Sequence, residues 1–213
     1  DAQKVTVEIF PTDIGGPRVT VKDDGIGMSQ QNVADFWMRI GTANKQDNPV
    51  SEKFGRRQSG SKGVGRFACR RLGKHLKLTS IAKLGTRSYQ KTEMTFNWED
   101  FQKGKVVESV TCIAEVSALT SAEQGTTLEI WGGDLDEWST RGYDYLRRQL
   151  TILASNRGGH VPGFKIDPGF NIELTAPGLS DDPVEDIRES VIQASWGTLD
   201  AKIDAIGVAT FTL

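Results

Sequence analysis

The stretch VKDDGIGM, residues 21–28, decides the fold that we expect for this chain. It follows a region in which valine and isoleucine alternate with polar residues on both sides of a PTDIGGP turn, so residues 4–22 are predicted to form a β-hairpin. An acid and two glycines then follow at the strand end. Glycine is the usual residue where backbone must approach another group closely or adopt positive φ. Taken alone, this pattern is most often a simple β-turn.

A second glycine-rich stretch, SGSKGVGRF, occupies residues 59–67 and carries Lys62 and Arg66. It departs from the Walker pattern, and it matches the dinucleotide-binding fingerprint only weakly because no strand precedes it. Free backbone N–H groups at the start of a helix still favour an anion. We therefore interpret the acidic turn and the basic turn as contacts to the two ends of one ligand, with glycines for tight packing as the alternative.

The composition is that of an ordinary globular protein of 213 residues, with 37% hydrophobic and 25% charged residues. A formal charge of −2 gives no overall attraction to nucleic acid or to anionic membranes. No apolar run is long enough to span a bilayer, and no signal peptide is recognisable, so a cytoplasmic protein is expected. The two cysteines and two histidines argue against a disulfide framework or a zinc site.

The remaining pattern predicts a mixed α/β chain. Helices are expected over residues 29–40, 63–73, 144–155 and 181–196, and strands over 75–82, 88–98, 105–116, 124–132 and 170–175. Residues 41–63 are predicted to be a long loop, and loops of that length are usually functional. The fold class is therefore α/β (α+β), a two-layer sandwich of a mixed, largely antiparallel sheet with helices on one face.

Four motifs in order resemble the GHKL ATPases, the superfamily of gyrase B, the ninety-kilodalton heat-shock chaperones, sensor histidine kinases and MutL. The matching residues are V-x-D-x-G-x-G-M at 21–28, Ile40-Gly41-Thr42 with Lys45, the glycine stretch 60–65, and Gly125-Thr126. The resemblance spans about residues 1–135 and is nearest to the chaperone, MutL and MORC branches. It implies the Bergerat ATP-binding fold, with ATP and Mg²⁺ as ligands.

Carried over residue by residue, the resemblance implies that Asp23 pairs with the adenine amine and that Thr126 lies near it, usually through water. Gly25, Gly27 and Met28 belong to the base pocket. Residues 42–62 would form a lid over the nucleotide, with Lys45 as a phosphate contact. The residues expected to wrap the phosphates are Gly60, Lys62, Gly63, Val64 and Gly65.

The family's first helix, E-x-x-x-N-x-x-D-A, supplies the water-activating Glu and the magnesium-binding Asn. Asp1-Ala2 resembles its last two letters, so both residues would precede residue 1, and we expect no substitute elsewhere in the chain. We therefore assign no catalytic residue and no protein metal ligand. Residues 1–160 are interpreted as an ATP-binding domain without its first helix, and 161–213 as a C-terminal extension that could begin a transducer domain.

Two functions follow from the resemblance. In the first, the intact protein is an ATPase in which lid closure over ATP drives conformational change or ATP-dependent homodimerisation. In the second, the chain is a nucleotide-gated binding module for a partner or DNA, without efficient hydrolysis. Residues 53–77 carry nine Lys and Arg and no acid, which keeps nucleic acid open as a partner, although a solvated face with phosphate contacts explains the same run.

Overall fold

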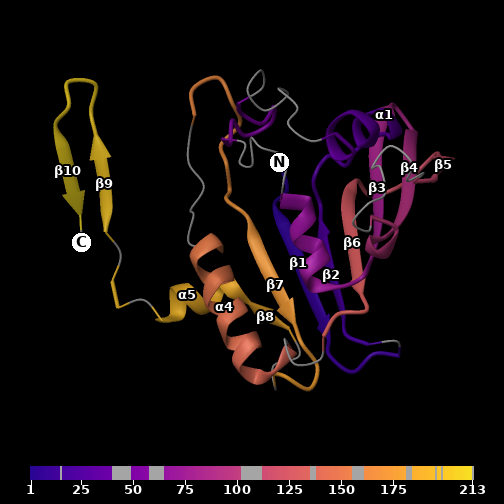
Figure 1. Ribbon diagram of the computed structural model, residues 1–213. Coiled ribbons are helices and arrows are strands. Elements are labelled where there is room, and N and C mark those ends of the chain that lie inside the picture. Colours follow the sequence, from indigo (N-terminus) through magenta and orange to yellow (C-terminus); the bar gives the residue numbers. More distant parts are fainter. Residues whose placement is uncertain are drawn as a thin grey trace.

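The computed structural model describes residues 1–14, 16–39, 49–57, 65–101, 112–134, 138–154, 161–180, 184–194, 196–197 and 199–212. Figure 1 shows one large sheet seen from the side that carries the helices, with a small hairpin standing apart at the C-terminal end. This arrangement confirms the predicted α/β class, with a mixed sheet and helices on one face.

The large sheet has eight strands in the order β5-β4-β3-β6-β2-β1-β7-β8. The strands are β1 (Lys4–Phe10), β2 (Arg18–Asp23), β3 (His75–Gly85), β4 (Ser88–Asn97), β5 (Ala114–Leu119), β6 (Gly125–Trp131), β7 (Asn171–Thr175) and β8 (Glu185–Asp186). Every neighbouring pair is antiparallel except β1 and β7, which run parallel. β7 and β8 therefore continue the sheet beyond residue 160, and a separate C-terminal unit from residue 161 stays a prediction.

The strand register gives the sheet one apolar and one polar face. Val7, Val21, Leu128, Leu78 and Met94 stand in one row across five strands. The adjacent row, on the opposite face, is polar: Thr6, Lys22, Thr127, Thr79 and Glu93. Alternation of this kind is typical of an antiparallel sheet with one face packed and one face toward solvent.

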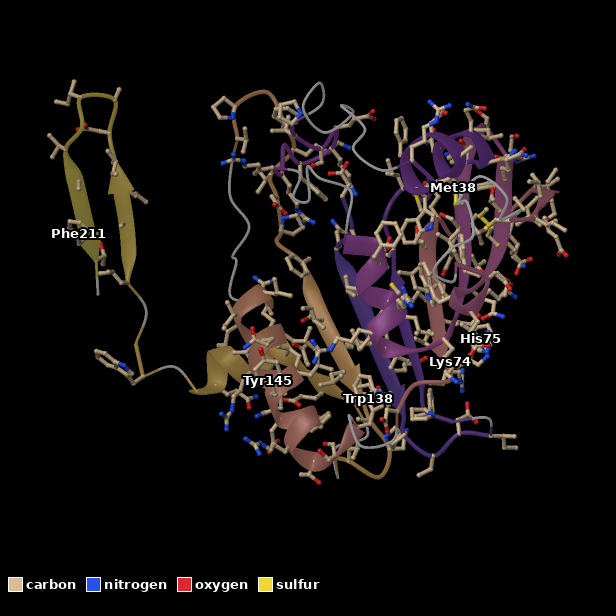
Figure 2. The ribbon with its side chains drawn as sticks, viewed as in Figure 1. Met38, Lys74, His75, Trp138, Tyr145 and Phe211 are labelled. Carbon is tan, nitrogen blue, oxygen red and sulfur yellow. The ribbon has the colours of Figure 1, made fainter. Side chains whose placement is uncertain are left out.

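The helices cover the apolar face. They are α1 (Gln30–Asn32), the π-helix η1 (Val33–Trp37), the 3₁₀-helix η2 (Gly65–Ala68), α3 (Cys69–Leu72), α4 (Thr140–Ala154) and α5 (Ile187–Ala194), and a further 3₁₀ turn, η3 (Trp98–Phe101), follows β4. One buried cluster joins α4 and α5 to β1, β2 and β7, and it includes Trp138, labelled below α4 in Figure 2. A second cluster joins Val33 and Cys69 to β3, β4 and β6.

Several predicted elements have different bounds; the helix expected over 144–155, for example, begins at Thr140. The helix expected over 29–40 is a short α-turn that widens into η1, and the Ser29 side chain caps its start by accepting from the Asn32 N–H. Of the strand expected over 105–116, residues 105–111 lie outside the described residues. The described part continues into β5, which pairs with β4 from Tyr89 to Met94. The helix expected over 181–196 begins at Ile187, since β8 first pairs with β7 and Asp186 then caps the helix.

The C-terminal hairpin consists of β9 (Asp200–Ile203) and β10 (Ala209–Thr212). It stands away from the sheet, and Phe211 projects from it into open space (Figures 1 and 2). Trp196, in the preceding connection, is 97% exposed. Among the helices that the structure describes, none has the length and apolar character needed to cross a membrane.

Candidate functional site

Asp23 is the last residue of the central strand β2, and it lies directly across the β2–β6 ladder from Thr126. Its register partners place its side chain on the apolar face, under the helices. One carboxylate oxygen accepts the Gly25 N–H at 2.8 Å. Burial raises the pKa of Asp23, while hydrogen bonds from the Gly25 and Thr126 backbones oppose the rise. The site thus holds a half-buried carboxylate with backbone donors that favour its charged form.

Ser80 contacts both Met28 and Thr126, and the sequence analysis missed it. The group of Asp23, Met28, Ser80 and Thr126 is called the Asp23 corner below. The Ser80 side chain is fully buried in β3, its oxygen accepts the Met28 N–H at 2.8 Å, and it lies 3.0 Å from the hydroxyl of Thr126. The sequence contained a signal for it. Leu76, Leu78 and Ser80 alternate along β3 and face the same side of the sheet, so Ser80 is a polar residue on the apolar face. A buried hydroxyl requires partners, and here they belong to the two predicted motifs.

The glycines of both motifs allow close backbone approach. Gly27 has φ +66°, and a Cβ there would lie 1.9 Å from the carbonyl oxygen of Ile81. Gly125 has φ +150°, and its Cβ would lie 2.1 Å from the carbonyl oxygen of Asp23. The acidic turn is therefore pressed onto β3 and the start of β6 onto β2, as glycine alone permits. These two contacts shape the group of residues around Asp23. The tight-packing alternative concerned residues 59–67, of which 59–64 lie outside the described residues.

The helical segment of η2 and α3 lies on the same face of the sheet as the Asp23 side chain, because Cys69 packs with buried residues of β3, β4 and β6. At its far end, a Cβ on Gly73 would lie 2.5 Å from the carbonyl oxygen of Trp131, which is the opposite end of β6 from Thr126. The magenta coil in Figure 1 runs along the sheet between these two ends. Gly65 is thus placed on the same face of the sheet as the Asp23 side chain. The other predicted phosphate and lid residues, Lys45, Gly60, Lys62, Gly63 and Val64, lie outside the described residues.

Three of the cations over residues 53–77 are paired with acids in the described part of the chain. Lys74 pairs with Glu99 at 3.4 Å, and Lys77 pairs with Glu93 at 3.0 Å on the polar face of the sheet. Arg56 is engaged by an acid far along the chain, as described below. These pairings account for three of the nine cations, and nucleic-acid binding stays a prediction.

One E-x-x-x-N spacing does occur, at Glu93 and Asn97, and the expectation that the chain holds no such spacing was wrong. Both residues lie in β4 and project to the polar face, opposite Asp23, because they are in phase with Thr95. Glu93 contacts Lys77 and Lys91 there, and those lysines hold its pKa below the usual range. It is therefore placed away from the site. Across the described part of the chain, no cluster of three or more His, Cys, Asp or Glu could hold a metal ion.

The comparison with protein families agrees with this geometry. The model described as "Histidine kinase-, DNA gyrase B-, and HSP90-like ATPase" matches residues 1–126, a range that begins before β1 and ends at Thr126. It therefore includes Asp23, Ser80 and both glycine-rich stretches. No curated protein matches the chain.

Proposed function

The chain belongs to the family of histidine kinase-, DNA gyrase B- and HSP90-like ATPases, and from this premise we propose that it binds ATP with the adenine against Asp23. The observation that carries the proposal is the Asp23 carboxylate itself. It lies half-buried at a strand end, under the helical layer, with the Gly25 N–H donating to it at 2.8 Å. A carboxylate in this setting is suited to accept a hydrogen bond from an exocyclic amine.

The surrounding groups fit a purine at this place. Burial raises the pKa of Asp23, and the backbone N–H groups of Gly25 and Thr126 oppose that rise. The carboxylate oxygens of Asp23 are the acceptors that the adenine amine requires. Thr126 and Ser80 form a pair of hydroxyls beside it and can hold a bridging water. Met28, whose backbone is fixed by Ser80, is partly buried against the core and offers an apolar side chain to a flat ring. Guanine would present a carbonyl oxygen where adenine presents its amine, and the carboxylate would repel it.

For the phosphates we propose the glycine stretch that leads into η2. Gly65 begins that helical segment on the Asp23 side of the sheet, and Gly60, Lys62, Gly63 and Val64 precede it directly. Backbone N–H groups together with a lysine are the usual means of holding phosphate oxygens. Lys45 would add a further phosphate contact. Mg²⁺ would arrive with the nucleotide, on its phosphate oxygens.

For the output we propose that ATP binding, with closure of residues 42–62 over the nucleotide, changes the conformation or the association state of the intact protein. When bound, ATP supplies the phosphoryl group whose hydrolysis would reset the change. A nucleotide-gated binding module without efficient hydrolysis is the second candidate. Glu93 and Asn97 lie on the polar face, away from Asp23, so they do not decide between the two candidates. A place in the chaperone, MutL or MORC branch is likewise a proposal.

Calorimetric titration with ADP, ATP and GTP tests the proposal. We expect ADP and ATP to bind with 1:1 stoichiometry and GTP to bind more weakly, because only adenine offers an amine to Asp23. Release of phosphate from ATP, followed in the same preparation with Mg²⁺, separates the two outputs. Equal affinity for GTP and ATP would contradict the assignment of Asp23.

A further inference from the structure

Arg56 lies where three distant parts of the chain meet. Its guanidinium forms a two-pronged contact with the Asp167 carboxylate, Nε to Oδ2 at 2.8 Å and Nη2 to Oδ1 at 2.6 Å. Nη2 also donates to the Gly169 carbonyl at 2.8 Å, and Nη1 donates to the carbonyl of Ala2. All three nitrogens of the guanidinium therefore have acceptors, and the two charged side chains are only 21% and 14% exposed.

Aromatic side chains surround this contact. The guanidinium carbon lies 4.8 Å from the centre of the Phe54 ring and 6.0 Å from that of Phe170. Phe54 is buried, and Gly55 adopts φ +65° with the Phe164 ring only 2.8 Å from where a Cβ would stand. Flat, apolar surroundings strengthen a guanidinium–carboxylate pair and fix its plane. The arrangement is built from both segments, 51–57 and 161–170.

The same junction supports the Asp23 corner. A Cβ on Gly25 would lie 3.7 Å from the Cβ of Ala2 and 3.8 Å from its nitrogen, so Ala2 backs the acidic turn directly. Ala2 is held from the other side by Arg56. The Asp1 carboxylate adds to this, since it accepts the Lys53 N–H at 3.1 Å. Arg56 is therefore linked through Ala2 to Gly25, the residue whose N–H donates to Asp23.

We infer that Arg56, fixed by Asp167, is a positioning residue for the nucleotide site and couples its occupation to the segment 161–170. This inference rests on the proposed function of Asp23. Arg56 belongs to the cation run of residues 53–77, yet its donors are committed to Asp167 and to two carbonyls and not to a phosphate. Its effect on the nucleotide is therefore indirect, through Ala2 and the Gly25 turn. Because coupling is reciprocal, a nucleotide at Asp23 should in turn steady residues 161–170.

The contacts continue toward the C-terminal elements. The Asn171 N–H donates to the Gln3 carbonyl at 2.8 Å, at the start of the parallel β1–β7 pairing. The Asn171 side chain donates to Asp186 at 2.6 Å, and Asp186 in turn caps α5 through the Glu189 N–H. The segment that Arg56 holds is thus joined to the last helix before the C-terminal hairpin. A change at Arg56 has a continuous set of contacts through which to reach it.

The test compares Asp167→Asn with Asp13→Asn as a matched control. Asp13 pairs with Arg18 at the same 2.6 Å, in the β1–β2 turn at the other end of the sheet. ADP affinity is measured by calorimetry for both variants and the wild type. Amide hydrogen exchange of residues 161–171 is followed with and without ADP, a readout that a merely structural role would not move. Thermal melts without nucleotide establish that each variant is folded.

We expect Asp167→Asn to weaken ADP binding by about 5- to 10-fold, within the usual range of coupling between sites, and Asp13→Asn to leave it unchanged. ADP should slow exchange in residues 161–171 of the wild type and of Asp13→Asn, but not of Asp167→Asn. Arg56→Lys keeps the positive charge but cannot form the two-pronged contact with Asp167. It should therefore weaken ADP binding and abolish the protection as Asp167→Asn does. Wild-type affinity and protection in Asp167→Asn would overturn this inference alone, and failure of the wild type to bind ADP would overturn the proposed function together with it.

Discussion

The hydroxyls of Ser80 and Thr126 lie 3.0 Å apart, although 46 residues separate them in the chain. Thr126 stands across from Asp23 in the sheet, and Ser80 accepts the Met28 N–H, so this contact connects the two ends of the acidic turn. The Asp23 corner, proposed for adenine, therefore depends on a serine in the middle of β3 as well as on the motif residues themselves.

Replacing that serine should loosen the turn. In Ser80→Ala, the Met28 N–H loses its acceptor and Thr126 loses a partner, at a cost of about 1–3 kcal/mol for a buried unsatisfied donor. Thr79→Ala is the matched control, since Thr79 is the preceding residue, on the polar face, with only a 3.4 Å contact to Glu93. Urea unfolding measures both. Equal losses in the two variants would show that the Ser80 contacts contribute nothing particular.

Gly27 should tolerate no side chain. In Gly27→Ala, the new methyl group would meet the Ile81 carbonyl at 1.9 Å, so the turn must move off β3 in addition to bearing its positive φ. Gly178→Ala separates the two effects, because Gly178 has φ +84° with nothing within 4 Å of a Cβ. We expect about 1–2 kcal/mol of lost stability at Gly178 and substantially more at Gly27. Similar thermal midpoints for the two variants would contradict the close approach.

The hairpin of β1 and β2 was predictable because its signal is local. Alternation and turn residues within 4–22 are enough to set it, and the motif residues after it point to the site. The fold class followed from the order of such elements. The family match over residues 1–126 supports the same assignment, while the role of each site residue stays a prediction.

The remaining features depend on contacts between distant residues. The parallel pairing of β1 with β7 and the contact of Arg56 with Asp167, 111 residues apart, leave no trace in local periodicity. Ser80 was recognisable in the sequence as a polar residue at an inward-facing position of its strand. Its contact with Thr126, however, depends on the register of β3 against β6. The late start of α5 was set by the pairing of β8 with β7, which overrode the helical pattern before Ile187.

Acid should loosen the junction at Arg56. The hydrogen bond from Arg56 holds the pKa of Asp167 below its ordinary value of 3.8, so the stabilisation is present above that value and is lost as pH falls through the lower, folded-state pKa. Amide exchange of residues 164–171, taken relative to the intrinsic exchange rate at each pH, should therefore rise at pH below about 4 in the wild type. In Asp167→Asn the rise should be smaller, since no proton is taken up at this position. An equal rise in both proteins would contradict the assignment.

The contribution of Asp23 to stability should depend on pH in the opposite direction. Burial raises its pKa above the ordinary value of 3.8, so its contribution to stability is complete below that value and is lost as pH rises through the folded-state pKa. Relative to Asp23→Asn, the unliganded wild type should lose stability on going from pH 4 to pH 7. Urea unfolding of both proteins at the two pH values measures this difference. If Asp23→Asn were less stable than the wild type by the same amount at both pH values, the result would contradict the raised pKa.

The most direct measurement is the affinity for ATP of the wild type, Asp23→Asn and Asp24→Asn, by calorimetry. Asp24 accepts the N–H groups of Gln3 and Lys4, and no contact with adenine is proposed for it, so it serves as the control. Loss of a charged acceptor costs about 1.5–3 kcal/mol, which is about 10- to 100-fold in affinity. We predict that loss for Asp23→Asn and wild-type binding for Asp24→Asn. Unchanged ATP affinity in Asp23→Asn, or no ATP binding by the wild type, would contradict the account.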